Sequence, residues 1–191
     1  NYMKSPTRIT IGVQGSGAEN VEHLCFNVRS KDRYLALKRI VDFYPDIYGI
    51  VFCRTRMETK EIAEKLIEDG YNADALHGDL SQDQREYIMN KFRIKNLQIL
   101  VATDVAARGL DVKDISHIIN YNLPDEIIAY THRSGRTGRA GKKGISIVIV
   151  NLREKFKIKQ IEAKIKKKFQ LRPTPSGNEI CEKQVLHLMD K

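Results

Sequence analysis

Short runs of β-branched and other apolar residues alternate with longer amphipathic segments along most of this chain. Runs of this length and composition are typical of buried strands, and the segments between them are long enough for helices. A parallel pair of strands needs a long crossover connection, so strands that alternate with helices favour a mainly parallel sheet. The pattern predicts an α/β fold, with strands at residues 21–28, 48–53, 73–77, 97–102, 116–121 and 144–150.

Two of the expected helices have a recognisable first turn. Thr55 is followed by Glu58, and Ser81 is followed by Gln84, which is the capping-box pattern at helix starts. Ligands of open α/β sheets gather at the carboxyl ends of the strands. We therefore expect one working edge, formed by the loops CRT, HGD, ATD and NYNLP that follow the predicted strands.

Size, charge and cysteine content limit the class of protein. The chain has 191 residues, about one ordinary domain, and a net charge of +9, which suggests a polyanionic partner such as nucleic acid. No apolar run approaches the roughly 20 residues that span a bilayer. Cys25, Cys53 and Cys181 are far apart and form no C-x-x-C pair, which argues against a disulfide framework or a zinc site and predicts a reducing compartment.

The stretch HRSGRTGRAGKKG, residues 132–144, places five cationic side chains among four glycines. Like charges repel, and glycine loses more entropy on folding than any other residue, so the stretch predicts an anionic ligand. Arg136 and Arg139 are three residues apart on a segment expected to begin at or near a helix, which lets both guanidiniums converge on one site. Guanidinium groups fork onto phosphate oxygens. An ordinary charged surface loop is the alternative.

Two further polar stretches follow predicted strands, and we expect them on the same edge as the arginines. In ATDVAARGLD, residues 102–111, small residues allow close backbone approach, and the alternative is a plain strand-to-helix turn capped by Asp104. In LHGDLSQDQR, residues 76–85, Arg85 lies on the first turn of a helix, where it either grips a phosphate or is solvated. Helix N-termini suit phosphate in both cases.

The segments IVFCRT, HGDLSQDQR, ILVATDVAARGLDV and HRSGRTGRAG resemble, in this order and spacing, the second RecA-like domain of DEAD-box RNA helicases. The resemblance covers roughly residues 1–170. His132 and the Q-x-x-R pattern of Gln82 and Arg85 favour the DEAD-box class over the DEAH class, and RecQ-type DNA helicases match less well. The resemblance implies a RecA-like three-layer α/β/α fold and an ATP-dependent RNA helicase of the cytoplasm.

The resemblance also implies roles for individual residues. The catalytic residues would be Arg136, Arg139 and His132, the ATP-binding residues Gly109, Asp111 and Arg133, and the RNA-binding residues Thr55, Gly78, Gln82, Arg85 and Thr103. Arg139 would be the arginine finger, and Asp111 would contact the ribose. His132 and Arg133 would link across a cleft to the first domain. The RNA would be a single strand, held through phosphates and 2′-hydroxyls with little sequence preference.

Parts of a complete helicase are absent from the sequence. It contains neither a G-x-x-x-x-G-K-[ST] loop nor the D-E-A-D motif. ATP with Mg²⁺ would therefore be held mainly by an N-terminal RecA-like domain, with no metal site in this chain, and we expect the chain alone to be inactive as an ATPase. The opening residues NYMKSPTRITIG resemble the end of the interdomain linker, which predicts a fragment of a longer polypeptide.

The chain changes character after residue 150. Ile158, Ile161, Ile165 and Phe169 recur at helical spacing among lysines, which predicts a packed surface helix. Prolines and a glycine in QLRPTPSGN then interrupt the chain, so we place the RecA-like domain at residues 1–172 and a tail at 173–191. The tail resembles the exit of bacterial cold-shock-type DEAD-box proteins towards a dimerisation or RNA-binding extension. The alternative is a solvated helix face followed by a disordered end.

Two other classes of function stay open from the sequence. A free-standing RNA-binding or adaptor module explains the charge and the fold, but it gives no reason for Asp111, Arg136 and Arg139 to occur together. A domain of a DNA-translocating helicase is the other candidate, and the test is whether DNA stimulates turnover as RNA does.

Overall fold

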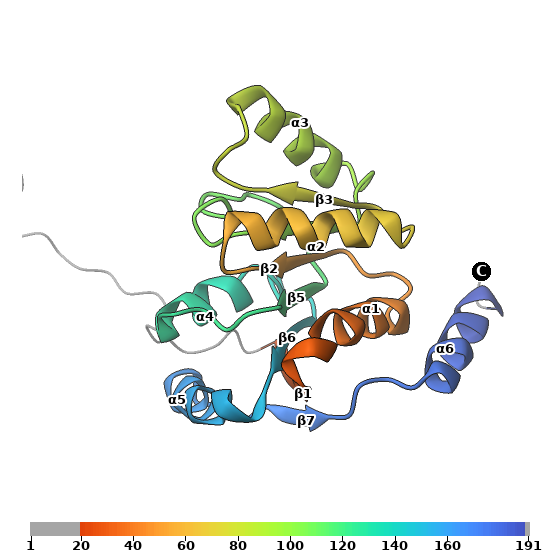
Figure 1. Ribbon diagram of the computed structural model, residues 1–191, viewed down its shortest axis with the longest axis vertical. Coiled ribbons are helices and arrows are strands. Elements are labelled where there is room, and N and C mark those ends of the chain that lie inside the picture. Colours follow the sequence, from red (N-terminus) through yellow and green to blue (C-terminus); the bar gives the residue numbers. More distant parts are fainter. Residues whose placement is uncertain (1–19, 190–191) are drawn as a thin grey trace, which may run out of the picture.

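The computed structural model describes residues 20–189, which form a parallel sheet of seven strands in the order β3-β4-β2-β5-β6-β1-β7 (Figure 1). Every strand pair is parallel. The strands are β1 (Val21–Asn27), β2 (Gly49–Phe52), β3 (Ala73–Leu76), β4 (Ile99–Ala102), β5 (His117–Asn120), β6 (Gly144–Val150) and β7 (Gln170–Arg172). The six predicted strands are confirmed. The short, exposed β7 was not predicted, because its three residues carry no apolar alternation.

Helices cover both faces of the sheet, which confirms the three-layer α/β/α fold. They are α1 (Arg33–Phe43), α2 (Arg56–Glu68), α3 (Gln82–Arg93), α4 (Ile127–Ser134), α5 (Lys155–Ile165) and α6 (Gly177–Met189). Helices α1 and α2 pack into one core cluster, and α3, α4 and α5 pack into two others on the opposite face. None of the helices within residues 20–189 is long and apolar enough to cross a membrane.

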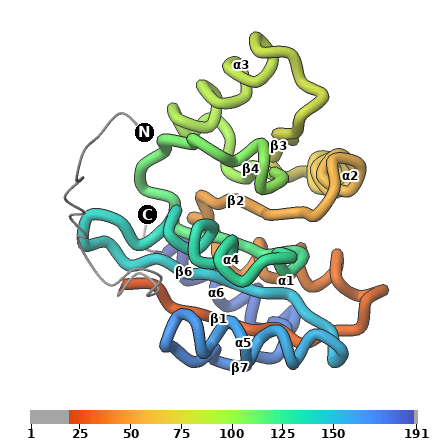
Figure 2. The backbone as a smooth tube through the Cα atoms, turned by 90° about the vertical axis from the view of Figure 1, so that its left-hand side faces the viewer, coloured from red at the N-terminus to blue at the C-terminus, as the bar shows by residue number. Residues whose placement is uncertain are grey.

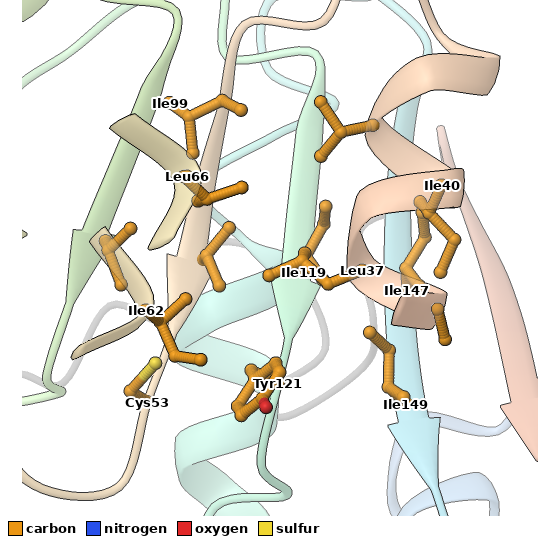
Figure 3. Packing of buried hydrophobic residues seen from close by; sticks show 14 of the residues in the cluster. Leu37, Ile40, Cys53, Ile62, Leu66, Ile99, Ile119, Tyr121, Ile147 and Ile149 are labelled. Carbon is orange, nitrogen blue, oxygen red and sulfur yellow. The ribbon is translucent and has the colours of Figure 1, made fainter. Parts of the chain in front are cut away.

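Strand alternation divides the core between the two faces. Along β2 and its end, Val51 and Cys53 join the cluster under α1 and α2, whereas Ile50 and Phe52 join the cluster under α3. Successive side chains of a strand point to opposite faces, so a central strand must be apolar on both sides. Figure 3 shows Cys53 and Ile62 packing in the first cluster. Each fully buried aliphatic side chain there contributes about 1.5–3 kcal/mol.

The two predicted capping boxes differ in the structure. Ser81 and Gln84 form the full box, with the Gln84 amide donating to Ser81 Oγ at 3.2 Å and the Ser81 amide donating to Gln84 Oε1 at 2.9 Å. At α2 only half of the box is present, because Glu58 Oε2 accepts from the amide of Arg54, one residue before the expected Thr55. The Glu58 amide still donates to Thr55 Oγ1 at 3.1 Å.

The segment after β4 is a turn, not the start of a helix, which corrects one expectation. Its turns run from Asp104 to Gly109, and no helix intervenes before β5. Ala106, Ala107 and Leu110 are buried under α3, so the segment serves as a packing layer. Asp104 caps no helix, and its carboxylate pairs with Arg133 instead.

The C-terminal part also departs in detail from its prediction. Helix α5 ends at Ile165, since Lys166 has a left-handed backbone with φ of 57°, so Phe169 lies beyond the helix although it packs on the same cluster. Helix α6 packs on α1, with Gln184 Nε2 donating to the Asp42 carbonyl at 2.5 Å. The proposed linker end, residues 1–12, lies outside the described residues.

His23 of β1 is a buried neutral base beneath α4. Its Nδ1 lies 2.6 Å from the Tyr130 hydroxyl, and burial, followed by the charge of Lys167, lowers its pKa from an ordinary 6.5 to about 4. The unfolded chain therefore binds a proton between these values that the folded chain excludes, and stability falls as the pH falls from 6.5 towards 4.

A His23→Gln variant tests this linkage. Between pH 7 and pH 5 it should lose less unfolding free energy than the unaltered chain by roughly 1–2 kcal/mol, because glutamine does not titrate. Urea unfolding at the two pH values measures the difference. His132→Gln, which makes the same replacement at an exposed position, is the matched control. An equal pH dependence in His23→Gln and the unaltered chain would contradict the assignment.

Candidate functional site

The turn that follows α4 brings two arginines to one pocket. Arg136 and Arg139 line a hollow of about 440 Å³ together with Asp111, Lys142 and Lys143. Burial, and then the positive charge of Arg139, lowers the pKa of Arg136, which indicates that the two guanidiniums lie close enough to repel each other. The hollow is therefore a mainly cationic site with two exposed carboxylates at its wall, Asp111 and Asp114, of which Asp114 pairs with Lys142.

Backbone contacts hold both arginines. Arg136 Nη1 donates to the Leu110 carbonyl at 2.7 Å, and Arg139 Nε donates to the Gly135 carbonyl at 2.8 Å. Helix α4 ends at Ser134, so the segment HRSGRTGR begins in its last turn, which confirms the expected position at or near a helix, and both arginines follow the end of that helix. Their approach to each other depends on the turn itself.

The arginine pocket does not lie on the carboxyl edge of the sheet, contrary to the expectation of one shared edge. Thr137 Oγ1 donates to the Ser116 carbonyl at 3.1 Å, just before β5, and the Gly144 amide donates to the Asn20 carbonyl at 2.9 Å, just before β1. These are the amino ends of the strands. A crossover helix runs antiparallel to its strands, so the residues after α4 come to the opposite edge (Figure 2).

Close packing explains a glycine in this turn. Gly138 has a φ of +67°, and a Cβ there would lie 2.6 Å from Val21 Cγ2. Gly141 has a similar φ of +76°, but a Cβ there would meet nothing within 4 Å. The two positions therefore separate backbone strain from steric overlap.

Alanine at these two glycines should destabilise the domain unequally. Gly141→Ala costs about 1 kcal/mol, the penalty of a left-handed backbone. Gly138→Ala adds the clash with Val21 and costs about 2 kcal/mol or more. Urea unfolding compares the two variants. Equal losses would show that the contact with Val21 imposes no constraint.

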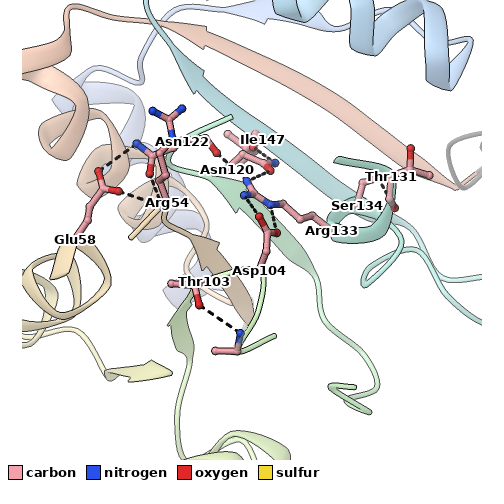
Figure 4. A network of polar contacts seen from close by, with 11 residues as sticks. Arg54, Glu58, Thr103, Asp104, Asn120, Asn122, Thr131, Arg133, Ser134 and Ile147 are labelled. Carbon is pink, nitrogen blue, oxygen red and sulfur yellow. Dashed lines mark hydrogen bonds and ion pairs between the residues drawn. The ribbon is translucent and has the colours of Figure 1, made fainter. Parts of the chain in front are cut away.

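Arg133 is a buried anchor beside this site. Its side chain is 3% exposed, and it grips Asp104 in bidentate fashion, with Nε donating to Oδ1 and Nη2 donating to Oδ2, both at 2.6 Å (Figure 4). Its Nη1 donates to Asn120 Oδ1 at 3.0 Å and to the Asn122 carbonyl at 2.8 Å. The guanidinium carbon lies 4.8 Å from the centroid of the Phe52 ring. These bonds hold the Arg133 guanidinium inside the domain, whereas the resemblance had implied that this side chain binds ATP.

The buried network continues towards α2. Asn122 Oδ1 accepts from the amide of Arg54 at 2.9 Å, and Asn122 Nδ2 donates to Glu58 Oε1 at 3.1 Å. The ends of β2 and β5 and the first turn of α2 are thus joined through polar bonds. Sequence reasoning missed Asp104, Asn120 and Asn122 as partners, although buried asparagines at the end of an apolar strand are a signal for such a network.

The predicted RNA-binding residues follow β2, β3 and β4. The register aligns Phe52 and Leu76 with Ala102, so these three strands end at one level and the expected carboxyl edge is confirmed. Thr55 and Gly78 are exposed there, in the loops after β2 and β3.

The other predicted RNA-binding residues differ in exposure. Gln82 is exposed on the first turn of α3, whereas Thr103 is 7% exposed, with Oγ1 accepting from the Ala106 amide at 3.3 Å. Arg85 is turned inward, and its Nη2 donates to the Ala106 carbonyl at 2.7 Å. Arg85 thus holds the turn after β4, a contact that neither of the two alternatives considered from sequence included.

The remaining predicted residues lie between the two regions. Gly109 has a φ of +73° in the turn. His132 is exposed and lines a smaller hollow of about 120 Å³ with Arg108 and Arg136. His132 thus lies beside the arginine pocket but not within it.

Comparison with known proteins places the chain in a family. The helicase conserved C-terminal domain family matches residues 33–141. The DEAD-box ATP-dependent RNA helicase CshA of Bacillus cereus is 37% identical over 190 residues, which cover 100% of this chain and 36% of that protein. The chain thus spans about a third of the length of its curated relatives.

Solved structures agree with this assignment. The E. coli DEAD-box protein SrmB, bound to the regulator of ribonuclease activity A, is 31% identical with a TM-score of 0.75, covering 85% of this chain and 94% of that chain. S. cerevisiae Dbp5 bound to RNA and ADP BeF3 is 26% identical with a TM-score of 0.83, covering 97% of this chain and 50% of that chain. The present chain therefore belongs to the helicase C-terminal domains and, among them, to those of the DEAD-box proteins.

Proposed function

We propose that this chain is the C-terminal RecA-like half of an ATP-dependent RNA helicase. It binds single-stranded RNA at the carboxyl edge of β2, β3 and β4, and it supplies Arg136 and Arg139 to ATP in a cleft formed with an N-terminal RecA-like domain. The observation that carries this proposal is the pocket in which Arg136, Arg139 and Asp111 come together. Without the first domain, the chain is inactive as an ATPase.

The chemistry of the pocket fits the phosphates and the ribose of ATP. Guanidinium groups donate in a plane to phosphate oxygens, and the Asp111 carboxylate accepts from ribose hydroxyls. Phosphoryl transfer spreads negative charge over the transferred group, so fixed cations there lower the barrier. Mg²⁺ with the triphosphate would supply further charge neutralisation. Lys142, which pairs with Asp114, and Lys113 make this side cationic, so we assign Mg²⁺ mainly to the first domain.

Two arginines act here as positioning residues. Arg133 holds Asp104 and the ends of the strands, and Arg85 holds the Ala106 carbonyl. We therefore reassign both from ligand contact to support of the turn at residues 103–111. Thr55, Gly78, Gln82 and Thr103 stay as the RNA-facing set, with His132 at the boundary with the first domain.

The turn at residues 103–111 links the two ligand regions. Arg85 of α3 bonds to it at Ala106, next to the RNA edge, and Arg136 bonds to it at Leu110, next to the ATP pocket. A movement of the turn on binding one ligand would thus change the placement of groups for the other. If each ligand prefers the closed arrangement of two domains, each raises the affinity for the other.

The test is ATP turnover by the complete two-domain helicase with single-stranded RNA, with DNA of equal length and with neither. We expect strong stimulation by RNA alone, and no turnover by the present chain under any of these conditions. Equal stimulation by DNA would favour a DNA-translocating helicase. The absence of turnover in the complete protein would favour an RNA-binding module without ATP chemistry.

A further inference from the structure

The arginines of this domain fall into bonded and unbonded groups. Nine arginine side chains within residues 20–189 hold a hydrogen bond or an ion pair with their neighbours. The arginines that hold none in the described part of the chain are Arg29, Arg39, Arg108 and Arg153. Arg108 lies beside Arg136 at the site already described. The other three surround the carboxyl ends of β1 and β6, which no predicted function uses.

These three arginines line two adjoining hollows. The first, of about 460 Å³, is lined by Arg29 and Arg153 with Ser30 and Asn151. The second, of about 380 Å³, is lined by Arg29 and Arg39, and Asp32 also borders it. Both hollows share the end of β1, so they form one continuous surface. We call Arg29, Arg39 and Arg153 with these hollows the β1–β6 patch.

The backbone at the β1–β6 patch is satisfied without the arginine heads. Asn151 Oδ1 accepts from the Arg153 amide at 2.9 Å, and Asn151 Nδ2 donates to Ser30 Oγ at 3.4 Å. The nearby carboxylate of Glu154 is already engaged by Arg33 at 2.8 Å. The guanidiniums of Arg29 and Arg153 therefore have no structural task in the part of the chain described here, and their charge is available to a ligand.

Exposed apolar side chains accompany the arginines. Leu152 lines the first hollow and is 65% exposed, and Leu35 lines the second and is 49% exposed. Phe156, on the first turn of α5, is 72% exposed. Cations beside exposed aliphatic side chains suit a single nucleic-acid strand, since guanidiniums bind its phosphates and stack on its bases, and apolar groups pack against the base faces.

The position of the β1–β6 patch favours RNA over an acidic peptide. In the sheet order, β5 and β6 separate β2 from β1, and all of these strands end towards the same edge. Three strand spacings place the end of β1 about 14 Å from the end of β2, where the proposed RNA-facing set begins. A strand that runs along the carboxyl edge therefore reaches the patch without leaving the surface.

We propose that the β1–β6 patch binds the phosphates of the RNA segment that extends beyond the ends of β2, β3 and β4. This inference rests on the proposed function, because it lengthens the RNA footprint of the same edge. Binding there would be independent of sequence, since contacts to phosphates carry no base information.

The test compares the 191-residue chain with an Arg29→Ala/Arg153→Ala variant on oligouridylates of about 6 and about 14 nucleotides, by fluorescence anisotropy at low salt. We expect the variant to lose about tenfold in affinity for the long RNA and to bind the short RNA unchanged. The slope of log affinity against log salt should fall by about 1.4 on the long RNA, for two lost phosphate contacts. Lys159→Ala/Lys164→Ala, on exposed positions of α5, removes the same charge and should change neither affinity.

Each of the other outcomes contradicts either the β1–β6 patch or the RNA edge of the proposed function. Equal weakening of both RNA lengths, or the same weakening in the lysine control, would show a general effect of charge and would overturn the β1–β6 patch. The β1–β6 patch would also be overturned if poly-glutamate displaced the labelled long RNA more effectively than unlabelled long RNA does. If the unaltered chain binds neither RNA, the RNA edge of the proposed function fails, and its extension fails with it.

Discussion

Replacing Arg139 with alanine should slow ATP hydrolysis by the complete helicase by about 10³–10⁵-fold, which is the range for loss of an arginine finger. Arg139 is exposed at the pocket, and only its Nε is held, by the Gly135 carbonyl. Its terminal nitrogens are therefore free to meet charge that develops on a phosphoryl group. Single-turnover hydrolysis with saturating RNA measures the effect, and RNA affinity should stay within about twofold because Arg139 lies far from the RNA edge.

Two companion variants make this result specific. Arg139→Lys should recover little of the rate, since an ammonium group cannot fork onto two oxygens. Lys143→Ala, in the same pocket, removes one charge without a guanidinium and should cost about tenfold at most. Arg136 is a poorer probe, because it also holds the Leu110 carbonyl and its loss would disturb the turn. A rate loss in Lys143→Ala as large as in Arg139→Ala would contradict the finger assignment.

Replacing Asp104 with alanine should lower the free energy of unfolding by about 3 kcal/mol. The change leaves the Arg133 guanidinium buried without its counter-charge, and a buried unpaired charge is among the most costly defects in a fold. Removing one partner of a buried ion pair costs roughly 3–5 kcal/mol. The expected loss is at the lower end of that range, because the Asp104 carboxylate is itself 40% exposed and partly solvated. Urea unfolding of the 191-residue chain measures it.

A double-mutant cycle separates the ion pair from simple packing. Arg133→Met removes the charge and keeps an apolar stem over the Phe52 ring, so the Asp104→Ala/Arg133→Met double variant should be more stable than Asp104→Ala alone. The difference should be about 1–2 kcal/mol. If the double variant is the less stable of the two, the cost of Asp104→Ala comes from the turn and not from an uncompensated charge.

The arginines show where sequence reasoning succeeds and where it stops. Arg136 and Arg139 were predicted to converge on one site from their spacing, and they line one pocket just after the end of α4. Arg133 stands in the same motif and carries the same charge, yet it is buried on Asp104. Arg85 lies at the predicted place on α3, but its guanidinium bonds to a carbonyl of the turn. Local spacing cannot predict the contacts of Arg133 and Arg85, because Asp104 and Ala106, to which they bond, are 29 and 21 residues away in the sequence.

The sequence by itself determined the α/β class, six of the seven strands, the helix starts at Thr55 and Ser81, and the family. These features rest on local patterns of apolar residues, on caps within one helical turn and on contiguous motifs. The tertiary structure alone decided which edge holds the arginines, which of them are free and how the turn at residues 103–111 joins the two ligand regions. These depend on α4 running antiparallel to its strands and on hydrogen bonds between distant segments, which no local pattern encodes.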